Sequence, residues 1–174
     1  LFGDGTGRFT SGKSSLISGG AQGLAIADFN RDGRADIAIA ATNVYTFLGK
    51  SAGSLDNPEM FAAGNGPVSI VAGDFNEDGK PDLATAARGG GDAAVLIGDG
   101  QGGFANPVLY SLSATADPLA VVTADFNRDT HLDLAVADLT DGAVHILLGD
   151  GKGTFSVTTH VVTGRDQRGL TAGD

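Results

Sequence analysis

The chain has 174 residues, a formal net charge of −10, 28 glycines and no cysteine. An acidic chain without clustered lysine and arginine is a poor match for nucleic acid, and no stretch approaches the roughly 20 apolar residues of a membrane span. The lack of cysteine also excludes disulfide bonds as the stabilising device.

Short apolar runs bounded by Gly, Asp and Asn recur in groups of four along the chain. They predict β-strands, because no segment carries a helix-length 3.6-residue period. The strands are predicted at 23–27, 35–41, 44–48 and 59–63, then 68–73, 81–87, 93–97 and 107–112, then 119–124, 132–137, 143–148 and 156–163. Runs that are apolar or small at nearly every position, such as 82–87, are typical of sheets buried on both faces. An all-β fold with four strands in each repeat predicts the blades of a β-propeller.

An acidic loop separates the first two strands of each group and has the same form at 28–36, 74–82 and 125–133. Oxygen-bearing side chains stand at loop positions 1, 3, 5 and 9: Asp28, Asn30, Asp32 and Asp36; Asp74, Asn76, Asp78 and Asp82; Asp125, Asn127, Asp129 and Asp133. Neighbouring residues of a tight loop point apart, so every second side chain can converge on one centre. The main-chain carbonyl of position 7 is the expected further ligand, from Arg34, Lys80 and His131. This pattern predicts sites for a hard cation such as Ca²⁺.

Position 6 of each loop is expected to need a positive φ, where the backbone turns sharply. Gly33 and Gly79 suit that position in the first two loops, but the third loop has Thr130. A β-branched residue is costly at positive φ, so we expect the third loop to be distorted or to bind more weakly.

The loops admit two other interpretations. An EF-hand would need a bidentate Glu at position 12 and flanking helices, whereas this position holds Ile39, Thr85 and Val136 inside predicted strands. The loops could also be acidic turns without a metal, because Asp, Asn and Gly favour turns in any case.

A second motif, with a Gly-Asp-Gly turn, recurs at 1–9, 48–55, 97–104 and 148–155, although the copy at 49–53 is degraded. The acidic loops lie 46 and 51 residues apart, a period typical of solenoids and propellers. We expect repeats at about 1–49, 50–98, 99–149 and an incomplete one at 150–174.

The D-F-N-x-D-G-x-x-D loop together with the L-G-D-G-x-G-x-F turn resembles the FG-GAP/VCBS-type repeat, a family that includes the propeller of integrin α subunits. The resemblance implies a Ca²⁺-stabilised β-propeller, commonly of seven blades, in a secreted or cell-surface protein. The chain would hold about three and a half blades, so we expect the missing blades in the same, longer protein. A dimer of half-rings fits poorly, because rejoining Asp174 to Leu1 would omit the second strand and most of the third.

The expected function is that of an extracellular module that binds a protein or glycan and is not catalytic in this segment. Asn65, Arg88, Asp92 and Asp117 fall in loops at the opposite edge of the blades from the acidic loops, and they are the predicted partner contacts. The alternative is the propeller of a carbohydrate-active enzyme such as a polysaccharide lyase, since some relatives have that activity. No set of residues here indicates catalysis, and the absence of Trp with only two Tyr weakens a sugar-stacking site.

Overall fold

The computed structural model describes residues 2–3, 6–10, 16–162, 164 and 169–172. Within these residues the chain is all-β, and its single helical segment is a short 3-10 turn, η1 (Ser51–Gly53). No helix in this described part is long and apolar enough to cross a membrane. The predicted repeats 1–49 and 150–174 include residues outside it, among them Leu1 and Asp174, so those repeat boundaries stay predictions.

Three four-stranded antiparallel sheets follow one another along the chain. Blade 1 comprises β3 (Gly23–Ala27), β4 (Asp36–Ala40), β5 (Val44–Phe47) and β6 (Glu59–Phe61). Blade 2 comprises β7 (Pro67–Gly73), β8 (Asp82–Ala87), β9 (Asp92–Leu96) and β10 (Val108–Ser111). Blade 3 comprises β11 (Pro118–Ala124), β12 (Asp133–Asp138), β13 (Ala143–Gly149) and β14 (Phe155–Val162). A short pair, β1 (Phe2–Gly3) with β2 (Phe9–Thr10), precedes them.

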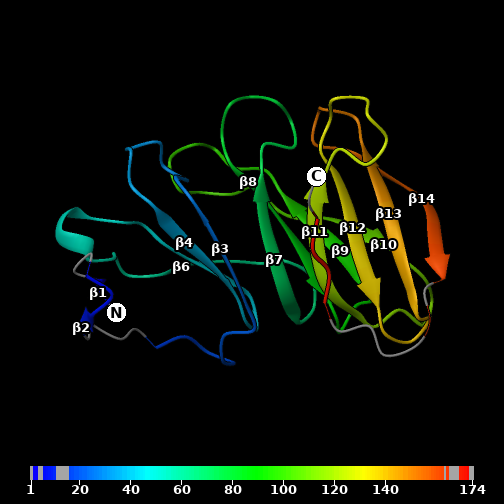
Figure 1. Cartoon of the computed structure of the whole chain (residues 1–174), viewed down its shortest axis with the longest axis horizontal. Coiled ribbons are helices and arrows are strands. Elements are labelled where there is room, and N and C mark those ends of the chain that lie inside the picture. The colour runs from blue at the N-terminus through cyan, green and yellow to red at the C-terminus, as the bar shows by residue number, and fades with distance from the viewer. Residues whose placement is uncertain (1, 4–5, 11–15, 163, 165–168, 173–174) are drawn as a thin grey trace.

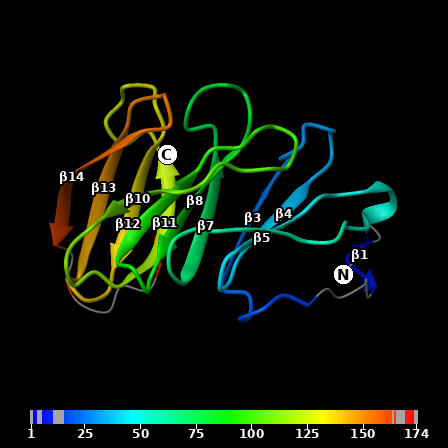
Figure 2. The ribbon, with the colours of Figure 1, turned by 180° about the vertical axis from the view of Figure 1, so that it is seen from behind.

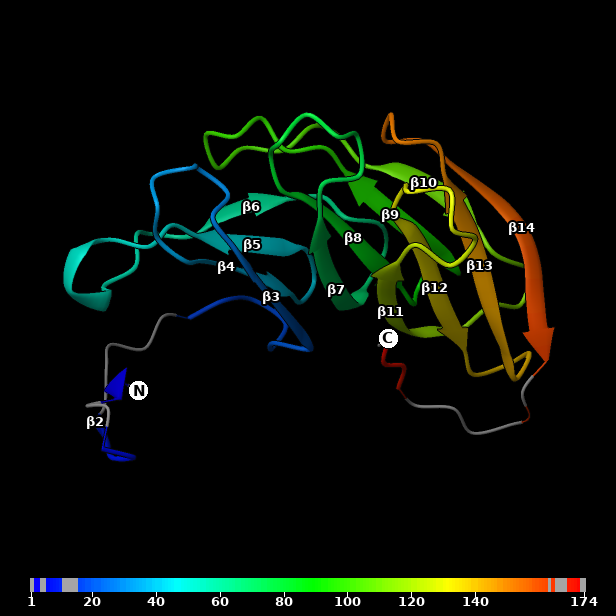
Figure 3. The same ribbon diagram turned by 45° about the horizontal axis from the view of Figure 1, so that its top comes forward.

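The blades stand side by side in a fan, as Figures 1 and 2 show from opposite sides. Their first strands, β3, β7 and β11, lie against one another along the inside of the arc (Figure 3). Each strand pairs with the next one in sequence, which is the up-and-down order of a propeller blade. The predicted fold class, a β-propeller of four-stranded blades, is confirmed.

The hydrophobic core lies between the blades. Ala25, Ala38 and Val44 of blade 1 pack in one cluster with Ile70 and Leu83 of blade 2. A second cluster joins blades 2 and 3 and includes the residues Phe75, Ala84, Val95, Val121, Leu134, Leu147 and Phe155. Burying each of the larger side chains stabilises the fold by about 1.5–3 kcal/mol.

The burial of each second strand follows from its neighbours. Every residue of β8 and of β12 is buried, as expected for sheets covered on both faces. In β4, burial instead alternates with partial exposure. Leu24, Ile26 and Met60 on the outer face of blade 1 are 55%, 61% and 59% exposed, because no described blade covers that face.

Candidate metal sites in the acidic loops

The three acidic loops join the first and second strands of their blades and share one backbone form. Positions 4 and 6 have positive φ in each copy: 58° and 82° in the first loop, 58° and 77° in the second, and 64° and 78° in the third. The last value belongs to Thr130, whose amide donates to the Asp125 carboxylate at 2.9 Å. The amides of Gly33 and Gly79 make the equivalent bonds to Asp28 and Asp74, at 2.7 and 2.9 Å. The expected distortion of the third loop is therefore absent. Thr130 itself takes the strained backbone conformation.

The oxygens of positions 1 and 3 converge on one point in every loop. In the first loop the Asp32 amide donates to Asp28 Oδ1 at 3.0 Å and to Asn30 Oδ1 at 3.1 Å. In the second loop both distances to the position-5 amide are 3.1 Å, and in the third they are 3.1 and 2.9 Å. Hydrogen bonds within each loop thus bring two candidate ligand oxygens together.

The position-5 carboxylate faces the residue two places on. Its Oδ1 accepts the position-7 amide at 3.0, 3.0 and 2.9 Å in the three loops. In the first two loops its Oδ2 also accepts a cationic side chain, from Arg34 at 2.8 Å and from Lys80 at 2.9 Å. Both pairs are accessible to water, so they contribute little to stability, and a bound cation would compete with them for the same oxygen.

Hydrogen bonds set the proton affinity of the position-5 carboxyls. The Lys80 ammonium, although partial desolvation opposes it, holds the pKa of Asp78 below its ordinary value. Hydrogen bonds from the His131 amide and the Asn127 side chain likewise lower the pKa of Asp129. Both side chains are therefore ionised at neutral pH, the state that a cation requires.

The position-9 aspartates, Asp36, Asp82 and Asp133, are fully buried, and each joins its loop to the Gly-Asp-Gly turn of the same blade. In blade 2, one Asp82 oxygen accepts the Phe75 amide at 2.9 Å and the other accepts the Gly98 amide at 2.8 Å. Asp36 makes the same two bonds at 2.8 and 2.6 Å, and Asp133 makes them at 2.9 and 2.9 Å. Burial raises the pKa of Asp82, and the neighbouring Asp78 and Asp74 raise it further. These side chains thus tie two loops together.

The residue types of each loop suit a calcium ion, although the three carboxylates of a loop do not lie within 4.8 Å of one another in the described part of the chain. Ca²⁺ takes six to eight oxygen ligands from carboxylates, amides, carbonyls and water. Each loop offers oxygens from three aspartates, one asparagine and a main-chain carbonyl, and none offers a sulfur ligand. A carboxylate has about four lone-pair sites, so the buried position-9 oxygens retain capacity beyond their two amide bonds.

A different cluster lies at the opposite edge of the blades. Among the described residues, the group of three Asp, Glu, His or Cys ligand atoms that lie within 4.8 Å of one another is Asp138, Asp141 and His145. Asp138 contacts the His145 ring at 3.1 Å and accepts the Asp117 amide, and Asp141 accepts the Ser113 hydroxyl at 2.8 Å. These bonds connect neighbouring loops and strands, so the cluster serves the blade 2–blade 3 contact.

The four predicted partner residues lie at this edge too, and two of them bind each other. The Arg88 guanidinium donates to both oxygens of Asp117, at 2.5 and 2.9 Å, across blades 2 and 3. Asp92 accepts the Ser111 hydroxyl at 2.8 Å, and the Asn65 carbonyl accepts the Gly89 amide at 2.8 Å. Their role in binding a partner stays a prediction.

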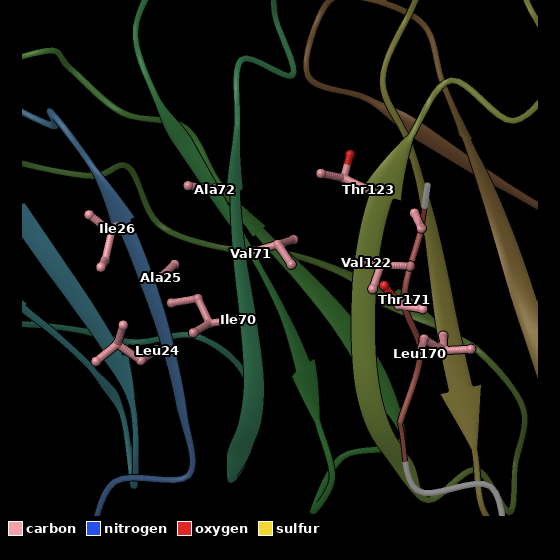
Figure 4. A pocket seen from close by; sticks show the side chains of 11 residues that line it. Leu24, Ala25, Ile26, Ile70, Val71, Ala72, Val122, Thr123, Leu170 and Thr171 are labelled. Carbon is pink, nitrogen blue, oxygen red and sulfur yellow. The ribbon is translucent and has the colours of Figure 1, made fainter. Parts of the chain in front are cut away.

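An open groove of about 410 Å³ runs along the first strands of the blades. Figure 4 shows Leu24 and Ile26 of β3, Ile70 and Val71 of β7, and Val122 of β11 along it, with Leu170 beside β11. Apart from two threonines the lining side chains are aliphatic, so the groove lacks the convergent polar groups that orient a small ligand.

The glycines that receive the loops were missed by the analysis of the sequence. Gly49, Gly98 and Gly149 donate to the position-9 carboxylates, and Gly102 and Gly153 donate to the loop of the preceding blade. The available signal was the recurrence of glycine at the end of each third predicted strand, 13, 16 and 16 residues beyond the buried aspartate.

Comparison with known proteins agrees with the repeated blade. The FG-GAP repeat model matches residues 20–55, and the FG-GAP-like repeat model matches residues 79–136. Four-stranded blades with these loops define a β-propeller repeat protein, and the chain belongs to the FG-GAP-type repeat family.

One solved structure, a protein from Lactobacillus plantarum, is similar to this chain with a TM-score of 0.60 at 13% sequence identity. The match covers 83% of this chain and 42% of that one, so the chain spans less than half of that protein's length. At this identity the likeness supports the fold alone. No curated protein matches the chain.

Proposed function

We propose that this chain is a calcium-stabilised β-propeller module of an extracellular protein, and that the loops opposite its acidic loops bind a protein or glycan. The observation that carries the proposal is one loop geometry built three times. In each copy the position-1 and position-3 oxygens converge on the amide of an ionised position-5 aspartate.

The chain's own residues would hold the ion as follows. The side chains of positions 1, 3 and 5, which lie toward the surface, and the buried position-9 carboxylate would supply the side-chain oxygens. The carbonyl of Arg34, Lys80 or His131 supplies the remaining protein ligand. Bound Ca²⁺ would offset two of the three negative charges that the aspartates of each loop carry when all are ionised.

The expected stabilisation is modest for each loop and useful in sum. Extracellular modules bind Ca²⁺ with Kd of about 10⁻⁴–10⁻³ M. At a free concentration about tenfold above Kd, each independent site stabilises the folded chain by about 1.4 kcal/mol. Such weak sites fill in the millimolar calcium outside cells, which agrees with the extracellular setting typical of FG-GAP repeats.

Thermal unfolding in millimolar Ca²⁺ and in EDTA tests the metal proposal. The wild-type midpoint should rise with Ca²⁺. The double variant Asp32→Asn with Asp78→Asn should remove most of that rise, because it removes a proposed ligand from two of the three sites. Both side chains are exposed at position 5, so the substitutions should disturb the fold little. The matched control is Glu59→Gln with Asp92→Asn, which removes the same charge away from the acidic loops. A wild-type midpoint that does not respond to Ca²⁺ would contradict the proposal and leave the loops as acidic turns.

The partner-binding part is supported by loops of blades 2 and 3 that meet at one edge. Arg88 and Asp117 come from different blades and form a bidentate ion pair there. A glycan array and a binding screen of extracellular proteins, each run with wild type and with Arg88→Ala plus Asp117→Ala, would test it. Binding that the double variant retains unchanged would argue against this edge.

A further inference from the structure

Each acidic loop also receives a turn from the next blade. The Gly102 amide in the Gly-Asp-Gly turn of blade 2 donates to the Phe29 carbonyl in the loop of blade 1, at 3.2 Å. The Gly153 amide of blade 3 makes the same bond to the Phe75 carbonyl of blade 2, at 2.9 Å. Phe29 and Phe75 hold position 2 of their loops, between the proposed ligands at positions 1 and 3.

Aromatic contacts accompany these bonds at both blade junctions. The ring of Phe29 meets that of Phe104 edge-on, with centroids 5.5 Å apart, and Phe75 meets Phe155 at the same distance. Position 2 thus supplies both a carbonyl and a ring to the next blade.

The backbone conformation and the close packing at this contact favour glycine. Gly102 and Gly153 have φ of 95° and 81°, so any other residue would be strained there. A Cβ on Gly153 would lie 2.7 Å from Ile97 Cδ1, and one on Gly102 would lie 2.9 Å from Leu48 Cδ2. The turn therefore rests directly on the preceding blade, beside its acidic loop.

Loop side chains also meet across the junction between blades 2 and 3. Glu77, at position 4 of the second loop, contacts His131, at position 7 of the third, at 2.5 Å. Both side chains cover Gly151 of the blade 3 turn. The acidic loops and turns of adjacent blades form one continuous edge, at the top of Figure 1.

From this geometry we infer that a cation bound in one acidic loop stabilises the junction with the following blade. The inference rests on the proposed calcium binding. Ligands at positions 1 and 3 fix the peptide units on either side of position 2, and so fix the carbonyl that accepts the next turn. Since coupling between two binding events is reciprocal, seating of the turn must raise the affinity of the loop for Ca²⁺ by the same factor.

Site-resolved NMR titration of the whole chain with Ca²⁺ tests the coupling. The position-6 amides of Gly33, Gly79 and Thr130 report the three loops separately. Gly153→Ala should weaken binding in the second loop by about fivefold or more, the lower range of allosteric coupling, and leave the first loop unchanged. Gly20→Ala is the matched control, because Gly20 has φ of 72° but a Cβ there meets nothing within 4 Å.

Hydrogen exchange of the folded protein provides the second measurement, and it keeps Gly102 and Gly153 unchanged. Ca²⁺ should slow exchange of the Gly102 and Gly153 amides. Asp32→Asn should abolish the effect at Gly102 alone, and Asp78→Asn should abolish it at Gly153 alone. This crossed pattern, a loop variant acting on the next blade, is not expected if each ion stabilises only its own blade.

Two results would overturn the inference in different ways. The coupling would be rejected if Gly153→Ala left the calcium affinity of the second loop unchanged and if Ca²⁺ did not slow exchange of the Gly102 and Gly153 amides. That result would leave the proposed function intact. No response to Ca²⁺ at any of the three reporters in wild type would reject the proposed function and the coupling together.

Discussion

Replacing the buried Asp82 by alanine should destabilise the chain even without calcium. The substitution leaves the Phe75 and Gly98 amides, both buried, without their acceptors at 2.9 and 2.8 Å. An unsatisfied buried amide costs about 1–3 kcal/mol, so two of them lower the free energy of unfolding by about 2–6 kcal/mol. The lower part of that range is the better expectation, because the burial that raises the pKa of Asp82 shows that its ionised form is itself disfavoured.

Urea unfolding in EDTA measures this effect, with Asp78→Ala as the comparison. Asp78 is ionised and exposed, and without metal its solvent-accessible pair with Lys80 should contribute little to stability. With Ca²⁺ present both variants should lose metal binding. Equal destabilisation by the two variants in EDTA would refute the role of Asp82 as a tie between loop and turn.

Three further outcomes follow from individual side chains. Thr130→Gly should stabilise the chain by about 1 kcal/mol in urea unfolding, because a β-branched residue is strained at a φ of 78°. Unchanged or lower stability of the variant would contradict that strain. Phe155→Leu should destabilise by about 1–3 kcal/mol through loss of two edge-to-face ring contacts, and a smaller loss than for a similarly buried aliphatic truncation would argue against them. The Glu77 hydrogen bond raises the pKa of His131, so their pair stabilises fully below about pH 6.5 and ceases to do so as pH rises through the raised pKa. The stability difference between wild type and Glu77→Gln should therefore be larger at pH 5.5 than at pH 8.5, and a difference independent of pH would exclude this pair.

Much of the fold could be predicted because the signals are local and repeated. The strand positions follow from short apolar runs between Gly and Asp, and the observed strands agree with them in all three blades. Positive φ at position 6 was predictable because two of the three loops place glycine there, and Thr130 follows its repeat partners against its own preference.

The partners of the buried aspartates could not be predicted in the same way. Asp36 and Gly49 are separated by a strand, a turn and another strand, and only the folded blade brings them to 2.6 Å. The pattern at alternate loop positions marked the position-9 side chains as possible ligands, and it contained no sign of their bonds to the turns. Contacts between blades, such as Gly153 with Phe75, depend on the twist of whole sheets and lie beyond any local pattern.

Isothermal titration calorimetry of the chain with Ca²⁺ tests the central claim most directly, because it counts bound ions. We expect up to three ions per chain, with Kd of about 10⁻⁴–10⁻³ M, and the loss of one in Asp78→Asn. No binding at millimolar Ca²⁺, or a stoichiometry unchanged in that variant, would contradict the assignment of the acidic loops as calcium sites.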